Sequence, residues 1–163
     1  MPRVTLRVNG AIHEVEVEPH DTLARVLREK LGFTDVKASC EKGECGSCTV
    51  LMDGKAVVSC LLLAVKADCR EITTARGLAR EGKLHILQEK LIEHDAIQCG
   101  YCTPGMLMSA KALLDGNPNP SEDDIRRALS GNICRCTGYQ QIVEAIAAAA
   151  KEQGINRGTE PKT

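Results

Sequence analysis

The sequence has 163 residues, enough for one sizeable domain or two small domains that share an interface. Lysine and arginine number 21 against 22 aspartate and glutamate residues, so the formal net charge is −1 and the basic surface of a nucleic-acid-binding protein is excluded. Only 2% of the residues are aromatic, which argues against the stacking platforms that bind single-stranded nucleic acid.

The first half of the chain predicts a small β-sheet with one helix across it. Apolar and polar residues alternate over 4–8 and again over 15–17, and Asn9-Gly10 between them is a strong hairpin signal. Asp21 is expected to cap a helix with one apolar face, which Gly32 ends. Further strands are expected at 49–52, 56–58 and 70–73, the first two joined by a hairpin turn at Asp53-Gly54. This pattern predicts an α+β domain.

The second half of the chain predicts helices. Four segments are expected: one that carries Leu84, Leu87 and Leu91; one that begins at Thr103-Pro104 and ends at Gly116; one that opens with a Ser121–Asp124 capping box; and one that starts near Tyr139. Four amphipathic segments joined by short loops indicate a small helical bundle.

The boundary between the two halves is expected in the charged, glycine-containing stretch 74–83. The sequence therefore predicts an α+β domain at 1–77 and an all-α domain at 78–150. The polar segment 151–163 is expected to be a mobile tail. The N-terminus shows no apolar signal segment and no run is long enough to span a membrane, so a cytoplasmic protein is expected.

Cysteine is the most informative residue type in this sequence. The chain has 9 cysteines. A reducing cytoplasm makes a disulfide framework a poor explanation, so metal binding is the leading interpretation. An odd total leaves one cysteine over after two sets of four ligands.

The first set of cysteines has the spacing of a cluster-binding loop. Cys40, Cys45 and Cys48 form C-x4-C-x2-C, and Cys60 follows after eleven residues. The plant-type ferredoxin pattern for a [2Fe–2S] cluster is C-x4-C-x2-C with a distant fourth cysteine. Glycines inside the loop suit a cluster, because the chain must turn sharply and bring N–H groups close to sulfur. A structural zinc site is the alternative, although zinc sites usually present C-x2-C pairs.

The second set of cysteines consists of a C-x2-C pair and a C-x1-C pair. Cys99 and Cys102 precede the helix expected at Thr103, and Cys134 and Cys136 follow after thirty-one intervening residues. Helix N-termini carry a partial positive charge that suits thiolates, and an antiparallel helix pair would bring the two edges together. The spacing allows either a zinc ion or a [2Fe–2S] cluster.

Three motifs of the chain resemble one known family. GECGSCTV, QCGYCTPGM and GNICRCTGY, in this order and spacing, resemble the iron–sulfur subunit of the molybdenum hydroxylases, the xanthine oxidase family, and the likeness covers about 4–150. The resemblance implies an N-terminal plant-type ferredoxin-like (β-grasp) domain and a C-terminal four-helix bundle, each with a [2Fe–2S] cluster. The implied ligands are Cys40, Cys45, Cys48 and Cys60 for one cluster and Cys99, Cys102, Cys134 and Cys136 for the other.

The resemblance also implies partner subunits. A large subunit would hold the molybdopterin and the substrate pocket, and a medium subunit would hold FAD unless the acceptor is external. Electrons would pass from molybdenum to the cluster of the bundle, then to the ferredoxin-like cluster, then to the flavin or acceptor. In the family the glutamine before CGYC, here Gln98, hydrogen-bonds the pterin, and the second cysteine of CRC, here Cys136, lies on the same approach. The implied assembly is a hetero-oligomer such as a dimer of heterotrimers.

Two positions do not follow the family pattern. The family usually has glycine before the first cluster cysteine, whereas this chain has Ser39, which would alter the loop without removing a ligand. Cys69 matches no family ligand, and its neighbours Asp68 and Arg70 predict a surface or strand-edge thiol without a function.

Two other functions are compatible with the sequence. A free-standing two-cluster ferredoxin would purify as a red-brown monomer without partner subunits. A zinc-stabilised interaction module would be colourless and would contain zinc but no acid-labile sulfide. The substrate of an implied complex is not encoded here, because its pocket would lie on another chain.

Overall fold

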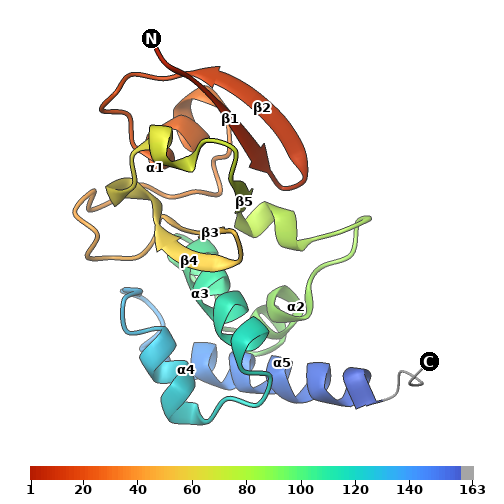
Figure 1. Cartoon of the computed structure of the whole chain (residues 1–163). Coiled ribbons are helices and arrows are strands. Elements are labelled where there is room, and N and C mark those ends of the chain that lie inside the picture. Colours follow the sequence, from red (N-terminus) through yellow and green to blue (C-terminus); the bar gives the residue numbers. More distant parts are fainter. Residues whose placement is uncertain (159–163) are drawn as a thin grey trace.

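A five-stranded mixed sheet forms much of the first half of the chain in the computed structural model, which describes residues 1–158 (Figure 1). Its strands are β1 (Arg3–Val8), β2 (Ala11–Glu16), β3 (Thr49–Met52), β4 (Lys55–Val58) and β5 (Glu71–Thr73). The spatial order is β2-β1-β5-β3-β4, with β1 and β5 parallel and all other neighbours antiparallel.

Both predicted hairpins are confirmed, with the expected turn residues. Asn9 and Gly10 have φ of 52° and 87°, and Asp53 and Gly54 have φ of 49° and 79°. Positive φ at both central residues is the requirement of a type I′ turn, whose twist matches that of the flanking strands. The strand predicted at 70–73 is also confirmed, as β5.

The helix across the sheet begins differently from the prediction. It consists of α1 (Leu23–Arg25) followed by a π-helical turn, η1 (Val26–Lys30). Thr22 is the N-cap, because its hydroxyl accepts the N–H of Arg25 at 3.3 Å. The prediction that Asp21 caps this helix is therefore wrong, since only the next residue has its oxygen in reach of the free N–H groups of the first turn.

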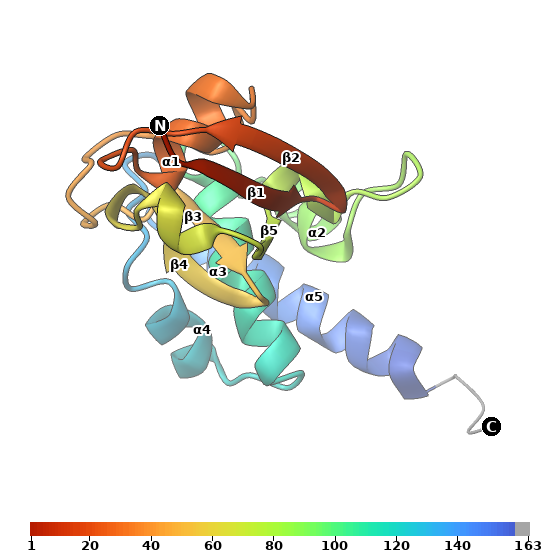
Figure 2. The same ribbon diagram turned by 45° about the horizontal axis from the view of Figure 1, so that its top comes forward.

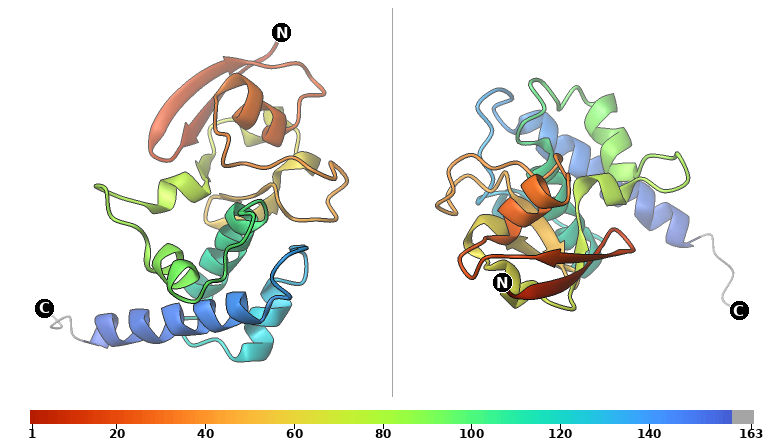
Figure 3. Two further views of the ribbon diagram at one scale, coloured as in Figure 1. Left: turned by 180° about the vertical axis from the view of Figure 1, so that it is seen from behind. Right: turned by 90° about the horizontal axis from the view of Figure 1, so that it is seen from above.

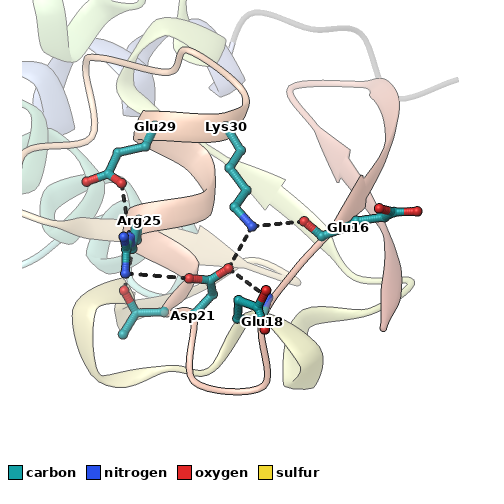
Figure 4. A network of polar contacts seen from close by, with 7 residues as sticks. Glu16, Glu18, Asp21, Arg25, Glu29 and Lys30 are labelled. Carbon is teal, nitrogen blue, oxygen red and sulfur yellow. Dashed lines mark hydrogen bonds and ion pairs between the residues drawn. The ribbon is translucent and has the colours of Figure 1, made fainter. Parts of the chain in front are cut away.

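Asp21 instead has a buried carboxylate that ties the helix to the chain before it (Figure 4). The carboxylate accepts the N–H of Glu18 at 2.9 Å and Nζ of Lys30 at 2.7 Å. Lys30 also donates to the carbonyl of Glu16 at 2.9 Å. The Asp21 carbonyl accepts the N–H of Ala64 at 2.8 Å, so one residue fixes the helix to two separate segments.

Replacing Asp21 with asparagine should lower the free energy of unfolding by about 1–3 kcal/mol at pH 7, because a charge-assisted hydrogen bond to Lys30 is lost. The hydrogen bond from Lys30 holds the pKa of the Asp21 carboxyl below its usual value. A depressed pKa stabilises the fold above the unfolded-state value, so the deficit should stay constant above about pH 5 and shrink below about pH 4.

Urea unfolding of the two proteins at pH 7 and pH 3.5 measures this deficit. Glu29→Gln, which changes an exposed partner of Arg25, is the control and should have almost no effect. Equal stability of Asp21→Asn and the unaltered protein at pH 7 would contradict the assigned role.

The second half of the chain is helical, as predicted. Its helices are α2 (Ile86–Glu93), α3 (Thr103–Gly116), α4 (Glu122–Ala128) and α5 (Gln140–Gly158). α3 lies between the sheet and the other helices, and α5 packs along α2 and α4 (Figure 3). The Ser121–Asp124 capping box is confirmed. Leu84 was expected on the first of these helices, but it lies before α2 and is 46% exposed.

Short 3₁₀ turns lie between β4 and β5 and after β5. They are η2 (Ser59–Leu61), η3 (Ala64–Ala67) and η4 (Ala75–Leu78). α5 continues to Gly158 and Glu152 on it pairs with Lys90 of α2 at 2.8 Å, so part of the segment predicted as a tail is helical. The rest of that segment lies outside the described residues. No helix within residues 1–158 combines the length and apolarity needed to cross a membrane.

Two hydrophobic cores meet at strand β3. Val50 belongs to the core under α1, and the next residue, Leu51, belongs to the core of the helical half. Successive side chains of a strand point to opposite faces, so one face of β3 shares a core with residues of α1 and η1 and the other packs against α3. This shared strand brings the two cysteine-containing loops, which precede β3 and α5, to the same side of the molecule (Figures 1 and 2).

Candidate metal centres

The first cysteine loop winds around the sulfur of Cys40. Glu41, Gly43 and Gly46 have φ of 51°, 78° and 68°, which turns the chain back on itself. The N–H groups of Lys42 and Cys45 both point at Cys40 Sγ, each at 3.4 Å. These two donors lower the pKa of the Cys40 thiol from 9.0 to about 6, so the loop stabilises a thiolate.

The other two cysteines of the first set are buried. Cys48 begins the chain segment that enters β3, and Cys60 lies in η2. Ser59 Oγ donates to the carbonyl of Cys48 at 2.6 Å and so holds the two segments together. Burial, followed by the neighbouring Cys48 sulfur, raises the pKa of the Cys60 thiol to about 11. A buried thiolate requires a cation beside it, which is what a bound metal supplies.

The second cysteine set is assembled from two loops that are far apart in the sequence. Cys99 and Cys136 approach each other to 3.6 Å between their sulfurs. Burial, followed by the neighbouring Cys134 sulfur, raises the pKa of Cys102 to about 12. Burial alone would raise the pKa of Cys134, but the hydroxyl and the N–H of Thr137 lower it by donating to Cys134 Sγ at 3.1 and 3.4 Å.

Each set contains neighbouring sulfurs, which we call the four sulfur pairs: Cys99 lies 3.6 Å from Cys136, while Cys45 lowers the pKa of Cys40, Cys48 raises that of Cys60, and Cys134 raises that of Cys102. Two thiolates on one tetrahedral metal lie about 3.8 Å apart, given metal–sulfur bonds of about 2.3 Å. The separation of 3.6 Å between Cys99 and Cys136 agrees with this geometry. Within residues 1–158, no three Cys, His, Asp or Glu side chains converge around the position of a single ion. Four thiols in each set are the donors that a [2Fe–2S] cluster takes.

The two cysteine sets face each other across the junction of the two halves. Tyr101 donates its hydroxyl to the carbonyl of Ala38 at 2.7 Å, and Ile133 donates its N–H to the carbonyl of Cys45 at 2.9 Å. A cavity of about 210 Å³ lies between the loops. Its lining residues are Ser39, Cys45, Ser47, Cys99, Tyr101, Cys102, Ile133, Cys134 and Arg135. The exposed Ser39 is thus at the entrance to the space between the sets.

Exposure differs sharply within the second set. Cys134 is 9% exposed, whereas Cys99 and Cys136 are exposed to solvent, as are Gln98 and Arg135. The four exposed residues come from the ends of the two loops that form the set, so they mark one outward-facing edge of it.

The ninth cysteine, Cys69, is exposed, and it belongs to none of the four sulfur pairs. It occupies a turn with φ of 57°, where its N–H donates to the carbonyl of Thr5 at 2.7 Å. The predicted surface position of this thiol is confirmed. None of the four histidines joins the cysteines either, and His85 instead caps α2 by accepting the N–H of Leu87 at 3.2 Å.

Several residues that organise the cysteine sets were not predicted from the sequence. Tyr139 accepts the N–H of Cys134 on its hydroxyl at 2.9 Å, and Asn132 donates to the carbonyl of Gly46 at 3.0 Å. Thr137 supplies two donors to one sulfur. All three stand within the GNICRCTGY motif, but a polar residue in a loop is by default expected to face solvent.

Comparison with known proteins identifies the family. A model described as "2Fe-2S iron-sulfur cluster binding domain" matches residues 6–79, and one described as "[2Fe-2S] binding domain" matches residues 74–147. The nicotinate dehydrogenase small FeS subunit of Eubacterium barkeri is 47% identical over 148 residues, which are 91% of this chain and 94% of that one. The chain belongs to the iron–sulfur subunits of the molybdenum hydroxylase family.

Solved structures of this family have the same fold. A chain of quinoline 2-oxidoreductase from Pseudomonas putida 86 is 46% identical, with a TM-score of 0.91 over 98% of both chains. The aldehyde oxidoreductase from Desulfovibrio desulfuricans is 46% identical with a TM-score of 0.90, and the match covers 98% of this chain but 18% of that one. The chain is therefore a [2Fe–2S] subunit of an oxidoreductase, with a role in electron transfer, and the family matches favour iron over the zinc that the spacing of the second set also allowed.

Proposed function

We propose that the chain binds two [2Fe–2S] clusters and transfers electrons between a molybdopterin-bearing large subunit and a flavin subunit or an external acceptor. The observation that carries the proposal is that eight cysteines gather in two sets of four, and that cysteines of both sets line one cavity between the loops. When bound, such a cluster supplies one-electron oxidation and reduction. The proposed ligands are Cys40, Cys45, Cys48 and Cys60 for the first cluster, and Cys99, Cys102, Cys134 and Cys136 for the second.

The residues of the chain that surround the sulfurs would tune the two sites. N–H groups of Lys42 and Cys45 favour negative charge on the first set, and the two donors of Thr137 do so on the second. Burial of Cys48 and Cys60 excludes water from one side of the first set. Hydrogen bonds to sulfur and exclusion of solvent are two of the ways in which a protein sets a cluster potential without changing the ligands.

We also propose that residues 1–77 and 78–150 act as two domains, the second a four-helix bundle of α2, α3, α4 and α5. The two hydrophobic cores support this division, since the first contains only residues before position 77. Leu51 and Ala75 are the exceptions, because they pack into the core of the helical half and so attach the domains to each other.

The large subunit is proposed to cover the outward edge of the second set. Gln98 and Cys136 are exposed there, and Ile133 and Tyr101 beside them are 54% and 44% exposed. In the aldehyde oxidoreductase of Desulfovibrio desulfuricans the matching segment is part of a much longer chain, which supports permanent association. Gln98 would then hydrogen-bond the pterin, with Cys136 next to it. A flavin subunit and a dimer of heterotrimers complete the proposed assembly.

Co-production of the chain with a large subunit should yield a red-brown complex with about four iron and about four acid-labile sulfide per chain. Colorimetric iron and sulfide assays on the purified complex measure both. A colourless protein with zinc and no sulfide would refute the proposal. A stable monomer that carries the clusters but never copurifies with the large subunit would instead support a free-standing ferredoxin.

A further inference from the structure

Asn132 is a buried polar residue that joins the two cysteine loops. It is 5% exposed. Ser109 Oγ donates to its Oδ1 at 2.7 Å, and its Nδ2 donates to the carbonyl of Gly46 at 3.0 Å. The next residue, Ile133, donates its N–H to the carbonyl of Cys45 at 2.9 Å. Two successive residues of the second loop therefore hold two successive carbonyls of the first.

A side-chain amide is the group that satisfies both neighbours of Asn132. It accepts from Ser109 and donates to Gly46 at the same time, whereas a carboxylate can only accept and an apolar side chain can do neither. The Gly46 carbonyl also accepts the N–H and the hydroxyl of Thr49 at 3.1 and 2.7 Å. Within such a buried network, an unmatched group costs more than an average hydrogen bond contributes.

The position of this network connects it to both cysteine sets. Gly46 follows Cys45 directly, and Asn132 precedes Cys134 by two residues. The contact also reaches α3, because a Cβ added to Gly105 would overlap the carbonyl of Gly46. The backbone of the first loop thus touches α3, the helix that directly follows Cys102 of the second set, and neither has much space to shift.

We propose that Asn132 is a positioning residue that fixes the distance and orientation of the second cluster relative to the first. The inference rests on the proposed function, since it requires a cluster in each set. The Asn132 amide acts on the backbone beside Cys45 and is itself held by Ser109 of α3, so it couples the loop of one cluster to the helix that directly follows Cys102 of the other. Electron transfer between two centres depends steeply on their separation, which gives such a restraint a functional value.

The test is the magnetic interaction between the clusters in the fully reduced complex. Each reduced [2Fe–2S] cluster has an unpaired electron, and the splitting that two such centres cause in each other's electron paramagnetic resonance (EPR) lines depends on their distance and orientation. Asn132→Asp keeps the size of the side chain but places an oxygen against the Gly46 carbonyl. We expect both cluster signals to persist with full iron content, and the splitting between them to narrow or disappear. Asn119→Asp, the same chemical change at an exposed position, is the matched control and should leave the splitting unchanged.

Two complete signals with an unaltered splitting in Asn132→Asp would overturn the inference and leave the proposed function intact. Absence of two signals in the unaltered complex would refute the proposed function itself. If Asn132→Asp does not accumulate, Ser109→Ala is measured in the same way, since it frees one side of the amide and leaves the Gly46 contact. A smaller change of the splitting in Ser109→Ala supports the inference, and an unchanged splitting overturns it.

Discussion

Replacing Cys134 with serine should abolish one of two iron–sulfur signals and leave the other at full intensity. Cys134 is 9% exposed, lies next to Cys102, and receives two hydrogen bonds from Thr137 on its sulfur. A serine oxygen forms a shorter bond to the metal and is a harder ligand than thiolate, so a buried site shaped for sulfur is poorly filled. The first set shares no ligand with the second, so its cluster should be retained.

The measurement is EPR of the dithionite-reduced complex, with iron content determined on the same sample. Iron should fall by about half, because one of two equal clusters is lost. Cys69→Ser is the control, since this exposed cysteine belongs to no sulfur pair and both signals should persist. Loss of both signals from a folded protein, or of neither, would count against the assignment of Cys134 to a separate second site.

The elements with strong local signals were predicted correctly from the sequence. Asn9-Gly10 and Asp53-Gly54 form the expected turns because each pair provides positive φ at two successive residues. The Ser121–Asp124 capping box is satisfied entirely within one helical turn, so it needs no information from elsewhere in the chain. The prediction that Asp21 caps the helix is wrong because its carboxylate is bound by Lys30, a partner nine residues away that a local capping rule ignores.

Contacts between distant segments could not be predicted. The parallel pairing of β1 with β5 joins residues more than sixty positions apart, and a local pattern carries no register for it. The same limitation applies to Asn132, whose partner Gly46 is 86 positions away. The sequence predicts that glycines turn the first cysteine loop sharply, and Gly46 does so with φ of 68°. Gly46 also leaves space for the carbonyl of Gly131. This contact joins two distant segments, so no local pattern predicts it.

This second role of Gly46 gives a large expected effect for Gly46→Ala. A Cβ at this position would overlap the carbonyl oxygen of Gly131 and lie 2.7 Å from Nδ2 of Asn132. The carbonyl belongs to the backbone and cannot rotate away, so the two cysteine loops must separate. Positive φ adds about 1–2 kcal/mol for a residue with a Cβ. Together these effects should lower the free energy of unfolding by about 3 kcal/mol or more.

Thermal unfolding of Gly46→Ala should therefore show a Tm lower by about 6–12 °C. Gly54→Ala is the matched control: Gly54 has φ of 79° in the β3–β4 turn, and a Cβ there meets nothing within 4 Å. Gly54→Ala introduces the strain of positive φ without the clash. The difference in Tm between the two variants therefore measures the close contact between the loops alone. Equal losses in Gly46→Ala and Gly54→Ala would show that the close approach to Gly131 contributes nothing to stability. A larger loss in Gly46→Ala would show that this glycine is needed where the two halves meet, independently of any group that the cysteines bind.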